Sequence, residues 1–143
     1  MSKRLDHVGI VVNNIDDALT SYTNMLGLRV WDKGIVKIPE KGLQLVLLQI
    51  GDNFIELIQP TPGSQNREAR FLKERGEGLF HLSIFTERFD AEVEELKGKG
   101  FRVEEEEIKA LFPGHTVRLA WLPPRDTRGV WIELVDSASV PEV

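Results

Sequence analysis

Two stretches of the chain share one pattern of hydrophobic and polar positions. Residues 5–12 (Leu-Asp-His-Val-Gly-Ile-Val-Val) and 79–86 (Leu-Phe-His-Leu-Ser-Ile-Phe-Thr) are short, apolar and rich in branched side chains, which is typical of β-strands. Each is followed by apolar residues at helical spacing, from Ile15 to Leu26 in the first case and from Phe89 to Leu96 in the second. The pattern therefore predicts the same strand–helix start twice.

The helix ends and the last strands repeat as well. A glycine, which commonly ends a helix, follows each helical stretch at Gly27 and Gly100. Residues 54–59 (Phe-Ile-Glu-Leu-Ile-Gln) resemble residues 131–136 (Trp-Ile-Glu-Leu-Val-Asp). Counting the strands between, we expect strands at about 28–36, 42–50 and 53–59, and again at about 101–107, 116–122 and 130–136. Each half thus has the order strand, helix and three strands, which is an internal repeat.

The repeat predicts a single domain over residues 1–143, built from two modules. We expect module one at about 5–60, a linker helix at about 64–76, and module two at about 78–136. The fold class is α+β, with two βαβββ modules related by a pseudo-two-fold axis. A chain of this length can bury a core of its own without disulfides.

Composition narrows the chemistry that this fold can carry. The chain has 18 Lys and Arg against 23 Asp and Glu, a net charge of −5, which argues against binding to a nucleic-acid backbone. It has no cysteine, so disulfides, thiol catalysis and cysteine-ligated metals are excluded. A metal site must use carboxylates, other oxygen or nitrogen donors, and the three histidines, which are His7, His81 and His115.

Each half places a histidine on its first strand and a glutamate on its last. These residues are His7 and Glu56 in the first half and His81 and Glu133 in the second. Taken singly, a strand histidine is more often a hydrogen-bonded core or surface residue, and a strand glutamate usually faces solvent. A carboxylate between large apolar neighbours is costly to bury unless it is paired or binds a metal.

The repetition favours the metal interpretation. Two halves related by an approximate two-fold axis would bring His7, Glu56, His81 and Glu133 together, and four N and O ligands suit an octahedral divalent ion with two open positions. Two residues after each histidine, on the same strand face, stands a small residue, Gly9 or Ser83, which would leave room for a ligand.

The N-terminal residues do not have the pattern of a signal peptide, and no apolar run is long enough to cross a bilayer. We therefore expect a cytoplasmic protein with no membrane or nucleic-acid partner.

With these motifs in hand, the chain resembles the vicinal oxygen chelate superfamily (glyoxalase, bleomycin resistance and dioxygenase proteins), and within it the methylmalonyl-CoA epimerases. The resemblance runs from about Leu5 to Asp136. It is carried by the repeated strands already quoted and by two further segments, which are Phe71-Leu72 and Gly76-Glu77-Gly78-Leu79-Phe80-His81.

The resemblance implies a cupped mixed sheet around a divalent metal, which would be cobalt, manganese, nickel or zinc. The implied ligands are His7, Glu56, His81 and Glu133. The implied activity is a metal-dependent isomerase that epimerises an acyl-CoA thioester, with proton abstraction and return at C2 through a metal-stabilised enolate. Glu133 is the implied acid/base, and dimers are common among such proteins, so a homodimer is an expectation by analogy.

Two departures from the epimerase pattern keep other functions open. Some epimerases carry a second glutamate on the third strand of the first half, but residues 43–49 here contain no acid. Trp131 shares a strand face with Glu133 where a smaller aliphatic side chain is usual, and its indole would either narrow the pocket or stack on a flat substrate. The alternatives are a glyoxalase I-like lyase or isomerase, and a metal-free protein that binds a small ligand such as a drug.

Overall fold

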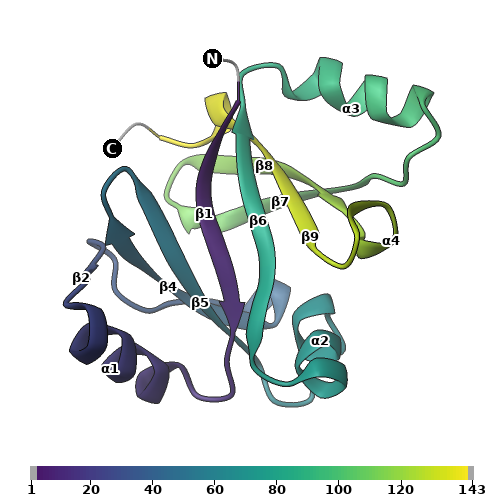
Figure 1. Ribbon diagram of the computed structural model, residues 1–143. Helices are drawn as coiled ribbons and strands as arrows, with labels where there is room; N and C mark the ends of the chain where they lie inside the picture. The colour runs from purple at the N-terminus through teal and green to yellow at the C-terminus, as the bar shows by residue number, and fades with distance from the viewer. Residues whose placement is uncertain (1–2, 142–143) are drawn as a thin grey trace. The chain divides into compact units, whose positions relative to one another are not determined.

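The computed structural model describes residues 3–141, which form two compact units. The first unit contains residues 7–80, and the second contains residues 81–141 together with residues 3–6. Both units contain a sheet and helices (Figure 1), so the predicted α+β class is confirmed.

The secondary structure follows the order expected from the repeat. The elements are β1 (Lys3–Val11), α1 (Ile15–Leu26), β2 (Arg29–Val30), β3 (Val36–Ile38), the 3-10 turn η1 (Pro39–Lys41), β4 (Leu43–Ile50), β5 (Asn53–Pro60), α2 (Arg67–Arg75), β6 (Gly78–Thr86), α3 (Phe89–Gly98), β7 (Glu104–Phe112), β8 (His115–Leu122), α4 (Pro124–Thr127), β9 (Trp131–Asp136) and the 3-10 turn η2 (Ser137–Ser139). None of the helices in the described part of the chain is long and apolar enough to cross a membrane.

Strand pairing repeats between the units. In the first unit the strand order is β2-β4-β5-β1, with β3 also paired to β4, and in the second it is β6-β9-β8-β7. The first strand of each unit pairs in parallel with the last, β1 with β5 and β6 with β9, and the remaining pairs are antiparallel. Each unit is therefore a mixed sheet with the same internal order.

One helix covers one face of the sheet in the first unit. Ile15 at the start of α1 is buried together with Val46, Leu48 and Leu57 from β4 and β5. Because side chains alternate across a strand, the residues between these, such as Glu56, point to the face opposite α1.

The second unit uses the same arrangement. Phe89 and Val93 of α3 are buried against Ala120 of β8 and Leu134 of β9. Glu133 precedes Leu134 and therefore points to the face opposite α3. In each unit the helix thus buries the apolar face and leaves the other face for polar chemistry.

Two predicted strand boundaries were wrong for local reasons. The strand expected at 28–36 is split into β2 and β3, because the chain turns at Gly34, whose N–H donates to the Trp31 carbonyl at 2.9 Å with φ at 61°. The strand expected to begin at 101 begins at Glu104, because the Phe101 N–H still donates to the Leu96 carbonyl at 3.0 Å and so prolongs the end of α3.

The first-unit core gives a direct stability test. Leu57 has no exposed surface and lies in the core cluster under α1, so Leu57→Ala should lower the free energy of unfolding by about 2–5 kcal/mol through lost burial and a residual cavity. Leu26→Ala is the matched control, because Leu26 is 55% exposed at the end of α1. Urea unfolding followed by circular dichroism measures both, and equal losses for the two variants would contradict this description of the core.

Candidate functional site

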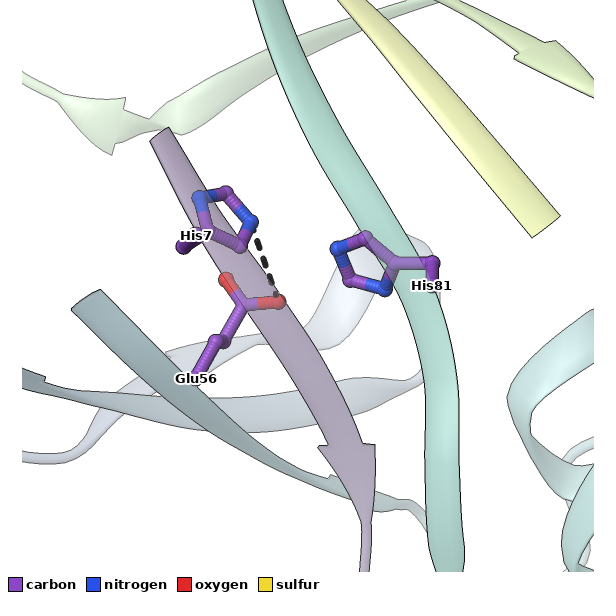
Figure 2. A group of neighbouring side chains, drawn as sticks. All are labelled: His7, Glu56 and His81. Atoms are coloured by element: carbon purple, nitrogen blue, oxygen red, sulfur yellow. Dashed lines mark ion pairs between the residues drawn. The ribbon is translucent and has the colours of Figure 1, made fainter. Parts of the chain in front are cut away.

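The first unit brings His7 and Glu56 together across two parallel strands. In the β1–β5 register, Gly9 lies beside Glu56 and His7 beside Phe54, so His7 and Glu56 are diagonal neighbours on the face opposite α1. Both are buried, with 8% and 9% of their surfaces exposed. His7 Nε2 lies 3.6 Å from Glu56 Oε1, and Figure 2 shows the two side chains pointing toward each other.

That separation fits ligands of a common ion. At 3.6 Å the two atoms are too far apart for a good direct hydrogen bond. Metal bonds to imidazole nitrogen or carboxylate oxygen are about 2.0–2.2 Å long, so two ligand atoms on one ion can lie up to about 4.3 Å apart. Buried nitrogen and oxygen donors of this kind suit several divalent transition metals.

The second unit repeats the pair with His81 and Glu133. In the β6–β9 register, Ser83 lies beside Glu133 and His81 beside Trp131, which matches the first unit position by position. His81 Nε2 lies 3.9 Å from Glu133 Oε1, and both residues are buried, at 2% and 8% exposure. The sequence repeat therefore extends to the placement of these side chains.

The small residue beside each glutamate differs in its effect. Gly9, beside Glu56, adds no side chain. Ser83 is fully buried, and its hydroxyl donates to Glu133 Oε1 at 2.7 Å. A hydrogen bond from a hydroxyl to a carboxylate is strong and directional. This bond holds the Glu133 carboxylate in one orientation. Gly9 has no side chain and cannot donate such a bond to Glu56.

In the structure, each predicted histidine lies next to the predicted glutamate of its own half. Each of the four predicted ligand residues is buried, lies on the face opposite its unit's helix, and has its His or Glu counterpart within 4 Å.

Aromatic rings lie beside the carboxylate in both units. In the second unit, Trp131 shares the strand face of Glu133, as predicted, and packs at right angles against Trp121 with ring centroids 6.0 Å apart. In the first unit, Phe54 holds the position of Trp131 and packs against Trp31 at 6.1 Å. Trp121 was not among the residues predicted from the sequence, and the β8–β9 register places it directly opposite Glu133.

An exposed acid lies just outside β4. β4 has no carboxylate, as predicted, but Glu40 lies exposed in η1, the turn that leads into β4. That turn is anchored to the start of α2, because the Asn66 side-chain amide donates to the carbonyls of Lys41 and Gly42, both at 2.9 Å.

Comparison with known proteins places this architecture in a family. A family model described as the Glyoxalase/Bleomycin resistance protein/Dioxygenase superfamily matches residues 6–139. The mitochondrial methylmalonyl-CoA epimerase of Homo sapiens is 35% identical over 132 residues, which cover 92% of this chain and 72% of that protein.

Solved structures agree with the sequence relatives. A Streptomyces coelicolor methylmalonyl-CoA epimerase variant in complex with 2-nitronate-propionyl-CoA is 29% identical with a TM-score of 0.82, covering 98% of both chains. A methylmalonyl-CoA epimerase in complex with methylmalonyl-CoA and NH4+ is 28% identical with a TM-score of 0.83, covering 100% of both. The chain therefore belongs to the glyoxalase, bleomycin resistance protein and dioxygenase superfamily, and methylmalonyl-CoA epimerases are among its relatives.

Proposed function

We propose that the protein is a divalent-metal-dependent epimerase of methylmalonyl-CoA or a close 2-substituted malonyl-CoA thioester. The observation that carries the proposal is the buried His–Glu pair present in each unit, in a chain with epimerase relatives. The solved relatives bound to methylmalonyl-CoA and 2-nitronate-propionyl-CoA support an acyl-CoA substrate.

We assign the metal ligands to His7, Glu56, His81 and Glu133, the first three of which are drawn in Figure 2. The two His–Glu separations of 3.6 and 3.9 Å fit ligands of one ion within each pair. This donor set accepts cobalt, manganese, nickel or zinc. When bound, such an ion supplies Lewis-acid stabilisation of negative charge that develops on a substrate carbonyl oxygen.

Glu133 is our candidate for one of the two acid/base groups. The hydrogen bond from Ser83 orients its carboxylate, and burial excludes water that would compete for the substrate proton. In the proposed reaction Glu133 removes the C2 proton of one epimer. The electron pair of that C–H bond passes into the thioester carbonyl, which leaves a planar C2 that can be protonated on either face.

Inversion needs a second acid/base on the opposite face of C2, and we assign this role to Glu40. β4 offers no carboxylate, whereas Glu40 is exposed in a turn whose backbone Asn66 anchors. An exposed acid on an anchored turn can exchange its proton with solvent and still hold its position. In the proposed reaction the second acid/base returns a proton to the other face of C2, and the two groups exchange roles in the reverse direction.

Metal binding and exchange of the C2 proton distinguish the epimerase from the two alternative functions. A glyoxalase I-like enzyme would also bind metal but would not exchange the C2 proton of methylmalonyl-CoA. A metal-free ligand-binding protein would do neither, and such a protein has no need to keep four buried ligand residues. The methylmalonyl-CoA epimerases among the relatives favour the epimerase.

Histidine substitutions test the metal site. His7→Ala and His81→Ala should each weaken binding of cobalt or manganese by at least about 10-fold, since loss of an outer-shell partner alone often costs that much. His115→Ala is the matched control, because His115 is exposed at the start of β8. Metal content after dialysis and isothermal titration measures the effect. A wild-type protein that holds no divalent ion and takes none up on titration would contradict both enzyme interpretations.

Glu133→Gln should reduce epimerisation of methylmalonyl-CoA by about 10²–10⁴-fold, because the amide cannot accept the C2 proton. Glu107→Gln is the matched control, since Glu107 is exposed on β7. Turnover is followed by chiral separation of the two epimers. Near-normal turnover in the Glu133 variant would remove this residue from the mechanism.

Deuterium exchange at C2 separates the two acid/base groups. Glu40→Gln should slow epimerisation by a similar factor but keep exchange with the epimer whose proton faces Glu133, while Glu133→Gln should keep exchange only with the other epimer. The measurement is ¹H NMR in deuterium oxide with each pure epimer, with and without chelator. If Glu40→Gln exchanges both epimers at wild-type rates, Glu40 is not the second acid/base.

A further inference from the structure

We propose that Trp131 is a specificity-determining residue, whose indole limits the C2 substituent of the substrate to about the size of a methyl group. The proposal rests on the proposed epimerase function, and it concerns residues of the second unit alone. It addresses a position that the mechanism above does not use.

Trp131 lies close to the proposed acid/base by strand geometry. It precedes Glu133 by two positions on β9, so both side chains project from the same face of the strand. β9 lies between β6 and β8 (Figure 1), and Trp121 on β8 is directly opposite Glu133. The carboxylate is therefore bordered by Ser83 on one neighbouring strand and by an indole on the other.

The indole of Trp131 packs against Trp121, which is itself buried and hydrogen-bonded. Trp121 is only 4% exposed, and its Nε1 donates to Glu106 Oε2 on β7 at 2.9 Å. Its ring packs edge-on against His81 at 5.2 Å and against Trp131 at 6.0 Å, with interplanar angles of 84° and 87°. Edge-to-face contacts at these distances are favourable and directional, so Trp131 has little freedom to move aside.

The fixed position of Trp131 beside Glu133 favours a steric limit on the size of the C2 substituent. When the C2 proton is within reach of Glu133, the other substituents of C2 lie within a few ångströms of the same strand face. Trp131 is half-buried, so part of its ring remains accessible on that face. Closely packed side chains move aside only at a cost in free energy when the substrate carries an added methylene. One methylene in such a contact typically changes kcat/KM by about 10–200-fold.

Glu106 is a positioning residue in this arrangement. Glu106 accepts the hydrogen bond from Trp121 Nε1 and so fixes the indole that packs against Trp131. A glutamine at this position can still accept the bond from Trp121 Nε1, whereas a leucine cannot. Selectivity should therefore survive Glu106→Gln and decline in Glu106→Leu.

The experiment compares kcat/KM for methylmalonyl-CoA and propylmalonyl-CoA, with deuterium exchange at C2 as the assay. Wild type should prefer the methyl substrate by about 10-fold or more. Trp131→Leu should lower this ratio by about 10-fold, chiefly through a smaller KM for the larger substrate, and Trp131→Phe should fall between. Phe101→Leu, an aromatic-to-leucine change at a 42% exposed position of the same unit, should leave the ratio unchanged.

The outcomes separate this proposal from the proposed function. If wild type exchanges neither thioester with metal present, the epimerase function fails. If it exchanges both but the ratio is unaltered in Trp131→Leu and Trp131→Phe, the specificity role is overturned and the epimerase function stands. A larger KM for propylmalonyl-CoA in these variants would also overturn it, because Trp131 would then be a binding platform. Thermal midpoints identify any variant that is unfolded, and the phenylalanine variant then decides.

Discussion

The buried His–Glu pair held between two parallel strands is the constraint on which the rest of the molecule depends. Burying an imidazole and a carboxylate is costly, and each unit accepts that cost on the one sheet face that its helix does not cover. The apolar residues that alternate with the pair are taken up by α1 or α3. Hydrophobic burial on one face therefore stabilises the sheet, and that sheet places the polar pair on the other.

The two units share the positions of these residues but differ in the contacts around the glutamate. Both units set a histidine, a glutamate and an aromatic ring at matching register positions. In the second unit a serine hydroxyl donates to the carboxylate, and a buried tryptophan that donates to Glu106 packs against the ring. These contacts orient the second glutamate and shape its surroundings. We assign the proposed proton transfer to Glu133 and the limit on substrate size to Trp131.

Local patterns were sufficient for most of the fold. Alternation and helical spacing predicted α1 from Ile15 to Leu26, and the side chain of Asn14 caps it by accepting from the Asp17 N–H at 3.0 Å. The repeated His and Glu lie within 4 Å of each other in each unit, because the parallel pairing of the first and last strands places them diagonally. Boundaries failed where a single hydrogen-bonded turn decided the outcome, as at Gly34 between β2 and β3.

The sequence by itself determined the repeated order of strands and helices and the four repeated His and Glu positions, because these follow from local periodicity and from comparing the two halves. Only the tertiary structure decided what surrounds them. The bonds from Ser83 to Glu133 and from Trp121 to Glu106 join residues 50 and 15 positions apart. The anchoring of the Glu40 turn by Asn66 likewise spans distant segments. Such contacts depend on strand register and side-chain direction, which no local pattern specifies.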